Sequence, residues 1–188
     1  EGVASTVITW PGGSAPSQEE CAPLLSYTED ASLLKWYCRN YSDYDQNGEV
    51  NIADFTVVGI SMQYSGPYEF ESYLSVLDAN YDDSINIEDL DPWAIYAFQH
   101  VDHYRVLRSS TPDDYPIFPT SPDDGGGIEV ATIDYHGENR FGYALEDRIW
   151  FEYVLEEPIE AGYYWVRPYD YHDNPGTPSN WVLVSAGK

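Results

Sequence analysis

Two acidic segments with the same residue pattern, 35 residues apart, constrain this chain more than any other feature. The first is residues 43–54, DYDQNGEVNIAD, and the second is residues 78–89, DANYDDSINIED. Oxygen-bearing side chains occupy positions 1, 3, 5, 9 and 12 of both, and a β-branched residue occupies position 8. Calcium binds six to eight oxygen atoms, which a tight loop of this pattern supplies. Two copies in the same register therefore predict two calcium-binding loops.

The candidate ligands are the residues at loop positions 1, 3, 5, 7, 9 and 12, with the backbone carbonyl used at position 7. They are Asp43, Asp45, Asn47, Glu49, Asn51 and Asp54 in the first loop, and Asp78, Asn80, Asp82, Ser84, Asn86 and Asp89 in the second. Position 6 requires positive φ, which suits Gly48 better than Asp83, so the second site is expected to be the more strained. Val50 and Ile85, at position 8, are expected to pair as a short bridge between the loops.

The paired loops resemble type I dockerins, the calcium-binding modules that bind cohesin domains. The resemblance rests on Asp43-Asp45-Asn47-Gly48-Val50-Asn51-Asp54 and Asp78-Asn80-Asp82-Ile85-Asn86-Asp89, and it covers residues 31–100. Asn at position 9, Asp at position 12 and an apolar residue after it favour this family over calmodulin-type loops. At positions 10 and 11, where dockerins commonly carry cohesin-contacting residues, the loops have Ile52-Ala53 and Ile87-Glu88. The resemblance implies a helical calcium module.

The period of the apolar residues divides the chain into four regions. Residues 1–20 hold a strand and linker, residues 21–108 the helical module, residues 109–127 a linker, and residues 128–188 an antiparallel β-domain. Helical spacing at residues 33–37, 73–77 and 93–98 predicts helices, and a period of two at residues 128–135, 149–156, 163–167 and 181–184 predicts strands. The expected fold class is α+β, with a dockerin-like module beside a small immunoglobulin-like β-sandwich.

The charge of the chain restricts its partners. It has 33 Asp and Glu against 8 Lys and Arg, a net charge of −25. This charge repels nucleic acid and anionic membrane surfaces, so neither is expected as a partner. No apolar run approaches the roughly 20 residues of a membrane span. Bound cations, high salt or both must relieve the self-repulsion.

Several features favour a location outside the cell. The chain begins at Glu1 without an initiator Met or a signal-peptide pattern, which suggests a mature form whose targeting segment has been removed. Cys21 and Cys38 could form a disulfide, and two buried thiols are the alternative. Asn40-Tyr41-Ser42 is a glycosylation sequon.

No nucleophile motif is present, so the chain is not expected to be an enzyme. The strand expected at residues 2–10 has no evident partner, and the β-domain lacks one strand. These two observations favour a subunit of a surface filament or layer that self-associates, or binds another extracellular protein, by strand addition. The alternatives are a cohesin-binding module and a carbohydrate-binding protein with a polysaccharide partner. Surplus aromatic residues support the latter: Trp150, Tyr163, Tyr164, Trp165, Tyr169 and Tyr171.

Overall fold

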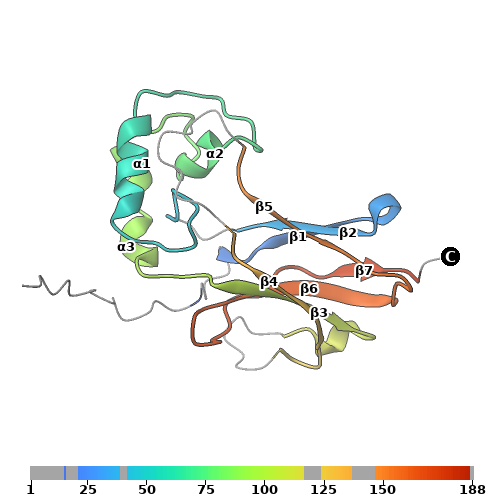
Figure 1. Cartoon of the computed structure of the whole chain (residues 1–188). Coiled ribbons are helices and arrows are strands. Elements are labelled where there is room, and N and C mark those ends of the chain that lie inside the picture. Colours follow the sequence, from blue (N-terminus) through green and yellow to red (C-terminus); the bar gives the residue numbers. More distant parts are fainter. Residues whose placement is uncertain (1–14, 16–20, 39–41, 117–123, 137–146, 187–188) are drawn as a thin grey trace, which may run out of the picture.

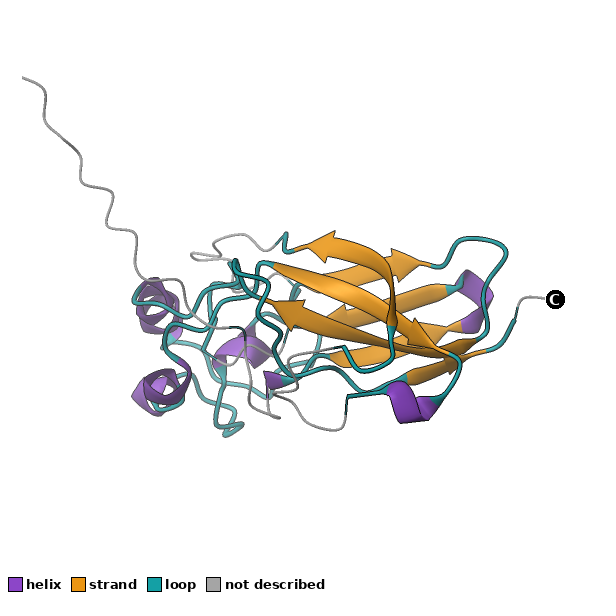
Figure 2. Ribbon diagram, turned by 90° about the horizontal axis from the view of Figure 1, so that it is seen from below, coloured by secondary structure: helices purple, strands orange, loops and turns teal. Residues whose placement is uncertain are grey.

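The computed structural model describes residues 15, 21–38, 42–116, 124–136 and 147–186, which form two antiparallel sheets and a few short helices. The α-helices gather at one end of the paired sheets (Figure 1), and further short helical turns lie at the opposite end (Figure 2). The first sheet has the order β1-β2-β5, from Leu24–Thr28, Leu33–Tyr37 and Trp150–Val154. The second has the order β4-β3-β6-β7, from Ile128–Asp134, His103–Ser109, Gly162–Tyr169 and Val182–Val184. The fold is therefore mainly β, with α-helix added.

The first sheet joins segments that are far apart in the sequence. In β2, Trp36 lies opposite Phe151 of β5, and Leu34 lies opposite Tyr153. The prediction of a helix over residues 33–37 is wrong, because all five residues pair with β5, which lies more than 100 residues away in the sequence. The four strands predicted from a period of two are all present, as β4, β5, β6 and β7.

A single hydrophobic core lies between the two sheets. Trp36 is fully buried there, stacks on Phe151 with ring centroids 5.9 Å apart, and meets Tyr104 of β3 edge-on at 5.6 Å. Val106 of β3 and Val166 of β6 complete its centre from the second sheet. Because both sheets contribute their inner faces, neither can bury its apolar side chains without the other.

The connection between β2 and β3 carries three helices, α1 (Ala53–Ser61), α2 (Leu74–Leu77) and α3 (Trp93–Tyr96), and the 3-10 turn η3 (Ile87–Leu90). The turns η2 (Glu29–Ala31) and η4 (Pro112–Asp114) lie elsewhere. The helices predicted near residues 73–77 and 93–98 are confirmed. A second core, whose buried members include Tyr44, Val57, Val58, Tyr73, Leu77 and Ile85, holds this segment together. No helix in the described ranges is long and apolar enough to cross a membrane.

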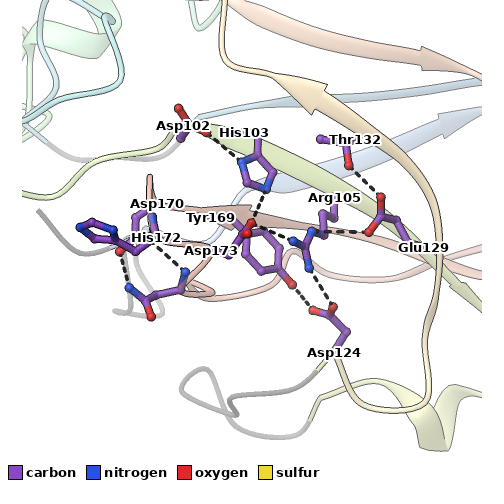
Figure 3. Close-up of polar contacts among 11 residues, drawn as sticks. Asp102, His103, Arg105, Asp124, Glu129, Thr132, Tyr169, Asp170, His172 and Asp173 are labelled. Carbon is purple, nitrogen blue, oxygen red and sulfur yellow. Dashed lines mark hydrogen bonds and ion pairs between the residues drawn. The ribbon is translucent and has the colours of Figure 1, made fainter. Parts of the chain in front are cut away.

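The outer face of the second sheet is covered by a charged network (Figure 3). Arg105 of β3 lies over the ring of Tyr169, with 4.2 Å from its guanidinium carbon to the ring centroid. Its nitrogens lie 3.5 Å from Glu129 Oε2 and 2.8 Å from Asp173 Oδ1. Asp124 lies on the same cation and accepts a hydrogen bond from the Tyr169 hydroxyl. The network therefore ties the segments around residues 124–129 and 170–174 to the sheet.

The predicted disulfide is absent: in the described part of the chain no bond joins Cys21 to Cys38. Cys38 packs against the core between the sheets, where its thiol lies beside the Tyr104 hydroxyl. Cys21 is buried outside that core. The strand expected at residues 2–10 and the sequon residue Asn40 lie outside the described residues.

Replacing Phe151 tests the importance of the shared core. Phe151→Ala empties a fully buried position between the sheets, and we expect it to lower the free energy of unfolding by about 3–5 kcal/mol. Val154→Ala on the same strand, where the side chain is 60% exposed, should change it by less than about 0.5 kcal/mol. Urea unfolding followed by tryptophan fluorescence measures both. Equal effects of the two substitutions would contradict a core shared by both sheets.

Candidate metal centre

The first acidic loop brings three carboxylates together in the interior. One oxygen from each of Asp43, Asp45 and Asp54 lies within 4.8 Å of the others, and all three residues are buried. The ion pairs among the described residues give none of them a cationic partner. Buried like charges without a counter-ion are strongly unfavourable, so this arrangement fits a bound cation.

Backbone N–H groups hold these carboxylates in place. Asp43 accepts from the amides of Asn47 and Gly48, each at 3.0 Å, on its two different oxygens. Asp54 Oδ1 accepts from Tyr44 at 2.6 Å and from Asp45 at 3.1 Å, and its Oδ2 accepts from Asn51 at 2.8 Å. The loop is therefore wrapped around the side chains at positions 1 and 12.

The second loop repeats these hydrogen bonds at equivalent positions. Asp78 accepts from the amides of Asp82 and Asp83, each at 3.1 Å. Asp89 Oδ1 accepts from Ala79 at 2.8 Å and Asn80 at 3.4 Å, and its Oδ2 accepts from Asn86 at 2.8 Å. The backbone matches as well, with positive φ at positions 4 and 6 of both loops. The four residues are Gln46 (53°), Gly48 (95°), Tyr81 (58°) and Asp83 (64°). Asp83 therefore adopts the strained left-handed conformation expected at position 6.

The two loops are interlocked, but not through the predicted pairing of Val50 with Ile85. The amide of Val50 donates to Gln99 O at 2.9 Å, and the amide of Ile85 donates to Tyr64 O at 3.4 Å. The loop at residues 43–54 thus pairs with the segment after α3, and the loop at residues 78–89 pairs with the segment after α1. The predicted pairing is wrong because the amides of Val50 and Ile85 bond to these two segments and not to each other. The Tyr44 hydroxyl also donates to the carbonyl of Asp89, which joins the loops directly.

The first loop is packed against the sheets, whereas the second faces solvent. The Tyr135 hydroxyl, just beyond β4, lies 3.3 Å from both Asp43 Oδ2 and the Gln46 carbonyl. Gln46 Oε1 accepts from the amide of Ile149 at 3.2 Å, and the Tyr171 hydroxyl donates to Glu49 Oε1 at 2.9 Å. In the second loop Asn80 and Asp82 are exposed. The first site therefore lies at the junction of helices and sheets.

The other predicted ligands serve partly as caps. Asn51 Oδ1 accepts from the amide of Ala53 at 2.8 Å, at the start of α1, and Asn86 Oδ1 accepts from Glu88 at 2.8 Å, at the start of η3. Asn47 and Asn80 each donate to the Asp two positions away, Asp45 and Asp82, at 3.3 and 3.1 Å. The Ser84 carbonyl accepts from Asn86 Nδ2 at 3.2 Å. Asn86 is therefore the N-cap of η3, whereas Asn51 lies one residue before Ile52, the N-cap of α1.

Burial and mutual repulsion raise the pKa values of the first-loop carboxylates. Burial, with repulsion from Asp54 and Asp45, holds the pKa of Asp43 well above its ordinary value. Burial raises the pKa of Asp45 to about 6 and that of Asp54 to about 7. Burial also raises the pKa of Asp78 in the second loop. In the first loop the buried carboxylates repel one another, and a cation bound there would favour their charged forms.

Sequence reasoning missed Gln46 and Tyr135 as parts of the site. Gln46 lies at loop position 4, which supplies no metal ligand, and Tyr135 is 92 residues from Asp43. No local pattern marks either residue. Tyr171 was noted only as a surplus aromatic residue.

Comparison with known proteins identifies no relative: no family model, no curated protein and no solved structure matches the chain. The fold and site therefore define it only by class, as a mainly β protein with paired acidic loops.

Substituting the closing residue of each loop tests the two sites. We expect titration calorimetry to find two calcium ions per chain, and Asp54→Asn and Asp89→Asn to leave one each. With calcium at about 100 times its Kd, each intact site should add about 2.7 kcal/mol to the free energy of unfolding. Asp134→Asn, at an exposed carboxylate outside the loops, should keep both sites. Retention of two ions by Asp54→Asn would contradict the assignment.

Proposed function

We propose that this chain is a calcium-binding structural protein of an extracellular assembly, stabilised by two calcium ions. The observation that carries the proposal is the same set of carboxylate–amide hydrogen bonds in both loops, with a buried carboxylate trio in the first. Side chains at positions 1, 3, 5 and 12 of each loop would hold the ion.

The donor set favours calcium over other common metals. It consists of oxygen atoms from carboxylates, amides and the backbone, without the His or Cys ligands that zinc and copper prefer. Magnesium demands near-ideal octahedral geometry and retains its waters, which suits a crowded protein loop poorly. A structural role is favoured over signalling, because the interlocked loops and the contacts of the first loop with Tyr135 and Ile149 oppose the helix opening that sensors undergo.

Strand addition at β4 is the proposed mode of assembly. Among the strands that the structure describes, β4 pairs only with β3, and its residues Ile128 and Val130 are exposed. It contains neither the proline nor the lysine that commonly blocks an edge strand. Residues 2–10 alternate in the manner of a strand and are the proposed donor, from the same or a neighbouring chain.

A charge on the edge strand tests this mode. We expect Val130→Lys to abolish calcium-dependent self-association, because the new ammonium groups oppose edge pairing. Val154→Lys, at the edge of the first sheet, is the matched control and should leave association unchanged. Deletion of residues 1–10 should match Val130→Lys. Size-exclusion chromatography with light scattering, in calcium and in chelator, gives the masses. A chain that is monomeric in calcium would contradict assembly by strand addition.

A dockerin-type protein-binding function is the second candidate. Ile52 and Ile87, at position 10 of the two loops, are 76% and 66% exposed. Ile60 of α1 and Ile95 of α3, again 35 residues apart, are exposed as well. Exposed apolar residues repeated in this way favour a docking surface for a protein partner such as a cohesin.

Charged substitutions on this surface separate the two candidates. We expect Ile52→Asp with Ile87→Asp to weaken capture of a cohesin domain at least tenfold, if the surface docks a cohesin. Leu183→Asp, at an exposed position of β7, should leave capture unchanged. Surface plasmon resonance with immobilised cohesins measures the effect. Failure of the unmodified chain to bind any cohesin would contradict this candidate.

The strand order supports the immunoglobulin-like interpretation of the sheets. If β1, β2 and β5 are labelled A, B and E, then β3, β4, β6 and β7 take the places of C, C′, F and G. The calcium-binding segment then lies in the connection between strands B and C.

A further inference from the structure

A cavity of about 280 Å³ lies between the second acidic loop and the end of the first sheet. Its wall includes Tyr37, Phe70, Asp78, Tyr81, Asp83 and Arg148. The volume lies at the small end of the range for ligand pockets and suits one six-membered ring rather than a long chain. The cavity is separate from the β4 edge and from the apolar surface of the helices.

Arg148 places a positive charge on this wall, near the carboxylate of Glu71. Its guanidinium carbon lies 4.2 Å from the ring centroid of Phe70 and 4.6 Å from that of Tyr37. Its Nη2 donates to Ser75 Oγ at 3.0 Å, and its Nε, which is buried, has no hydrogen-bond partner. The ion pairs of the described residues do not include it. The unpartnered Nε leaves this guanidinium able to donate one further hydrogen bond.

The remaining polar groups offer both acceptors and donors. The carboxyl group of Asp83 also lines the cavity, and the buried Tyr68 hydroxyl has no hydrogen-bond partner. Each hydroxyl of a sugar is both a donor and an acceptor. A wall with a guanidinium, a carboxylate and hydroxyls can therefore bind several hydroxyls of one ring at once.

Aromatic rings supply the apolar part of the cavity. Phe70 and Tyr81 are exposed at its mouth, and Phe70 meets the ring of Tyr37 edge-on at 5.3 Å. The C–H face of a sugar ring packs well on such rings because both offer a flat apolar surface, to which Tyr81 adds a hydroxyl. Exposed aromatic rings next to buried polar groups are the usual composition of a small-molecule site.

Charge selects among the possible ligands. The net charge of −25 and the carboxylate of Asp83 oppose an anionic ligand, and Arg148 opposes a cationic one. We propose that this cavity binds a single ring of a neutral saccharide. The proposal depends neither on strand addition nor on cohesin docking.

A glycan array of neutral and acidic oligosaccharides, probed with the full chain in calcium, tests the proposal. We expect binding to neutral glycans, and titration calorimetry with the best of them should give an affinity at least tenfold weaker for Arg148→Gln. Tyr81→Asn removes a ring at the mouth and should also weaken binding several-fold, while Asn tolerates the positive φ of this position. Because Tyr81 is exposed, this variant tests the site even if Arg148→Gln fails to fold.

Arg108→Gln is the matched control, since Arg108 does not line the cavity and should keep the unmodified affinity. Circular dichroism and urea unfolding, which do not depend on calcium binding, confirm that each variant is folded. Absence of binding to every glycan, binding to acidic glycans alone, or unchanged affinity in folded Arg148→Gln and Tyr81→Asn would each overturn the proposal.

Discussion

Electrostatic repulsion among Asp43, Asp45 and Asp54 is the constraint on which the rest of the structure depends. Three carboxylates that share a buried site without a cationic partner would push a loop apart, yet backbone amides hold these in a fixed arrangement. Hydrogen bonds from amides lower the cost of such charge but do not remove it, as the raised pKa of Asp54 indicates. A divalent cation, which we propose to be calcium, would supply the missing charge. In a chain of net charge −25, it would act where repulsion is most concentrated.

The position of this site explains why it matters beyond its own loop. The loops are interlocked through the segments that follow α1 and α3, so neither can form completely alone. The first loop also contacts Tyr135, Ile149 and Tyr171. Tyr135 directly follows β4, Ile149 directly precedes β5, and Tyr171 follows β6. A cation in the first loop would therefore stabilise the junction of helices and sheets. The second, more exposed loop would stabilise chiefly the helical segment.

The sequence was most informative where the physical cause is local. Loop positions and positive φ depend on neighbouring residues, so the loops and the strain at Asp83 could be predicted. The strands after residue 127 also followed from their alternation. The segment Leu33–Tyr37 was misassigned because its apolar residues fit helical spacing as well, and its partner β5 is remote in sequence. The bridging partners Tyr64 and Gln99 could not be predicted either, because the crossing of the two halves is a property of the tertiary fold.

Hydrogen exchange at the interlocked amides tests the central claim most directly. The amides of Val50 and Val101 bond to Gln99 O and Gly48 O, and exchange reports the free energy of opening each bond. If a cation holds the loops together, removing calcium with a chelator should lower protection of these amides at least about tenfold, or about 1.4 kcal/mol. The amide of Val166 in β6 should lose less, because it donates to Ser179 Oγ and not to a residue of either acidic loop. Equal protection of Val50 and Val101 in calcium and in chelator would contradict the account.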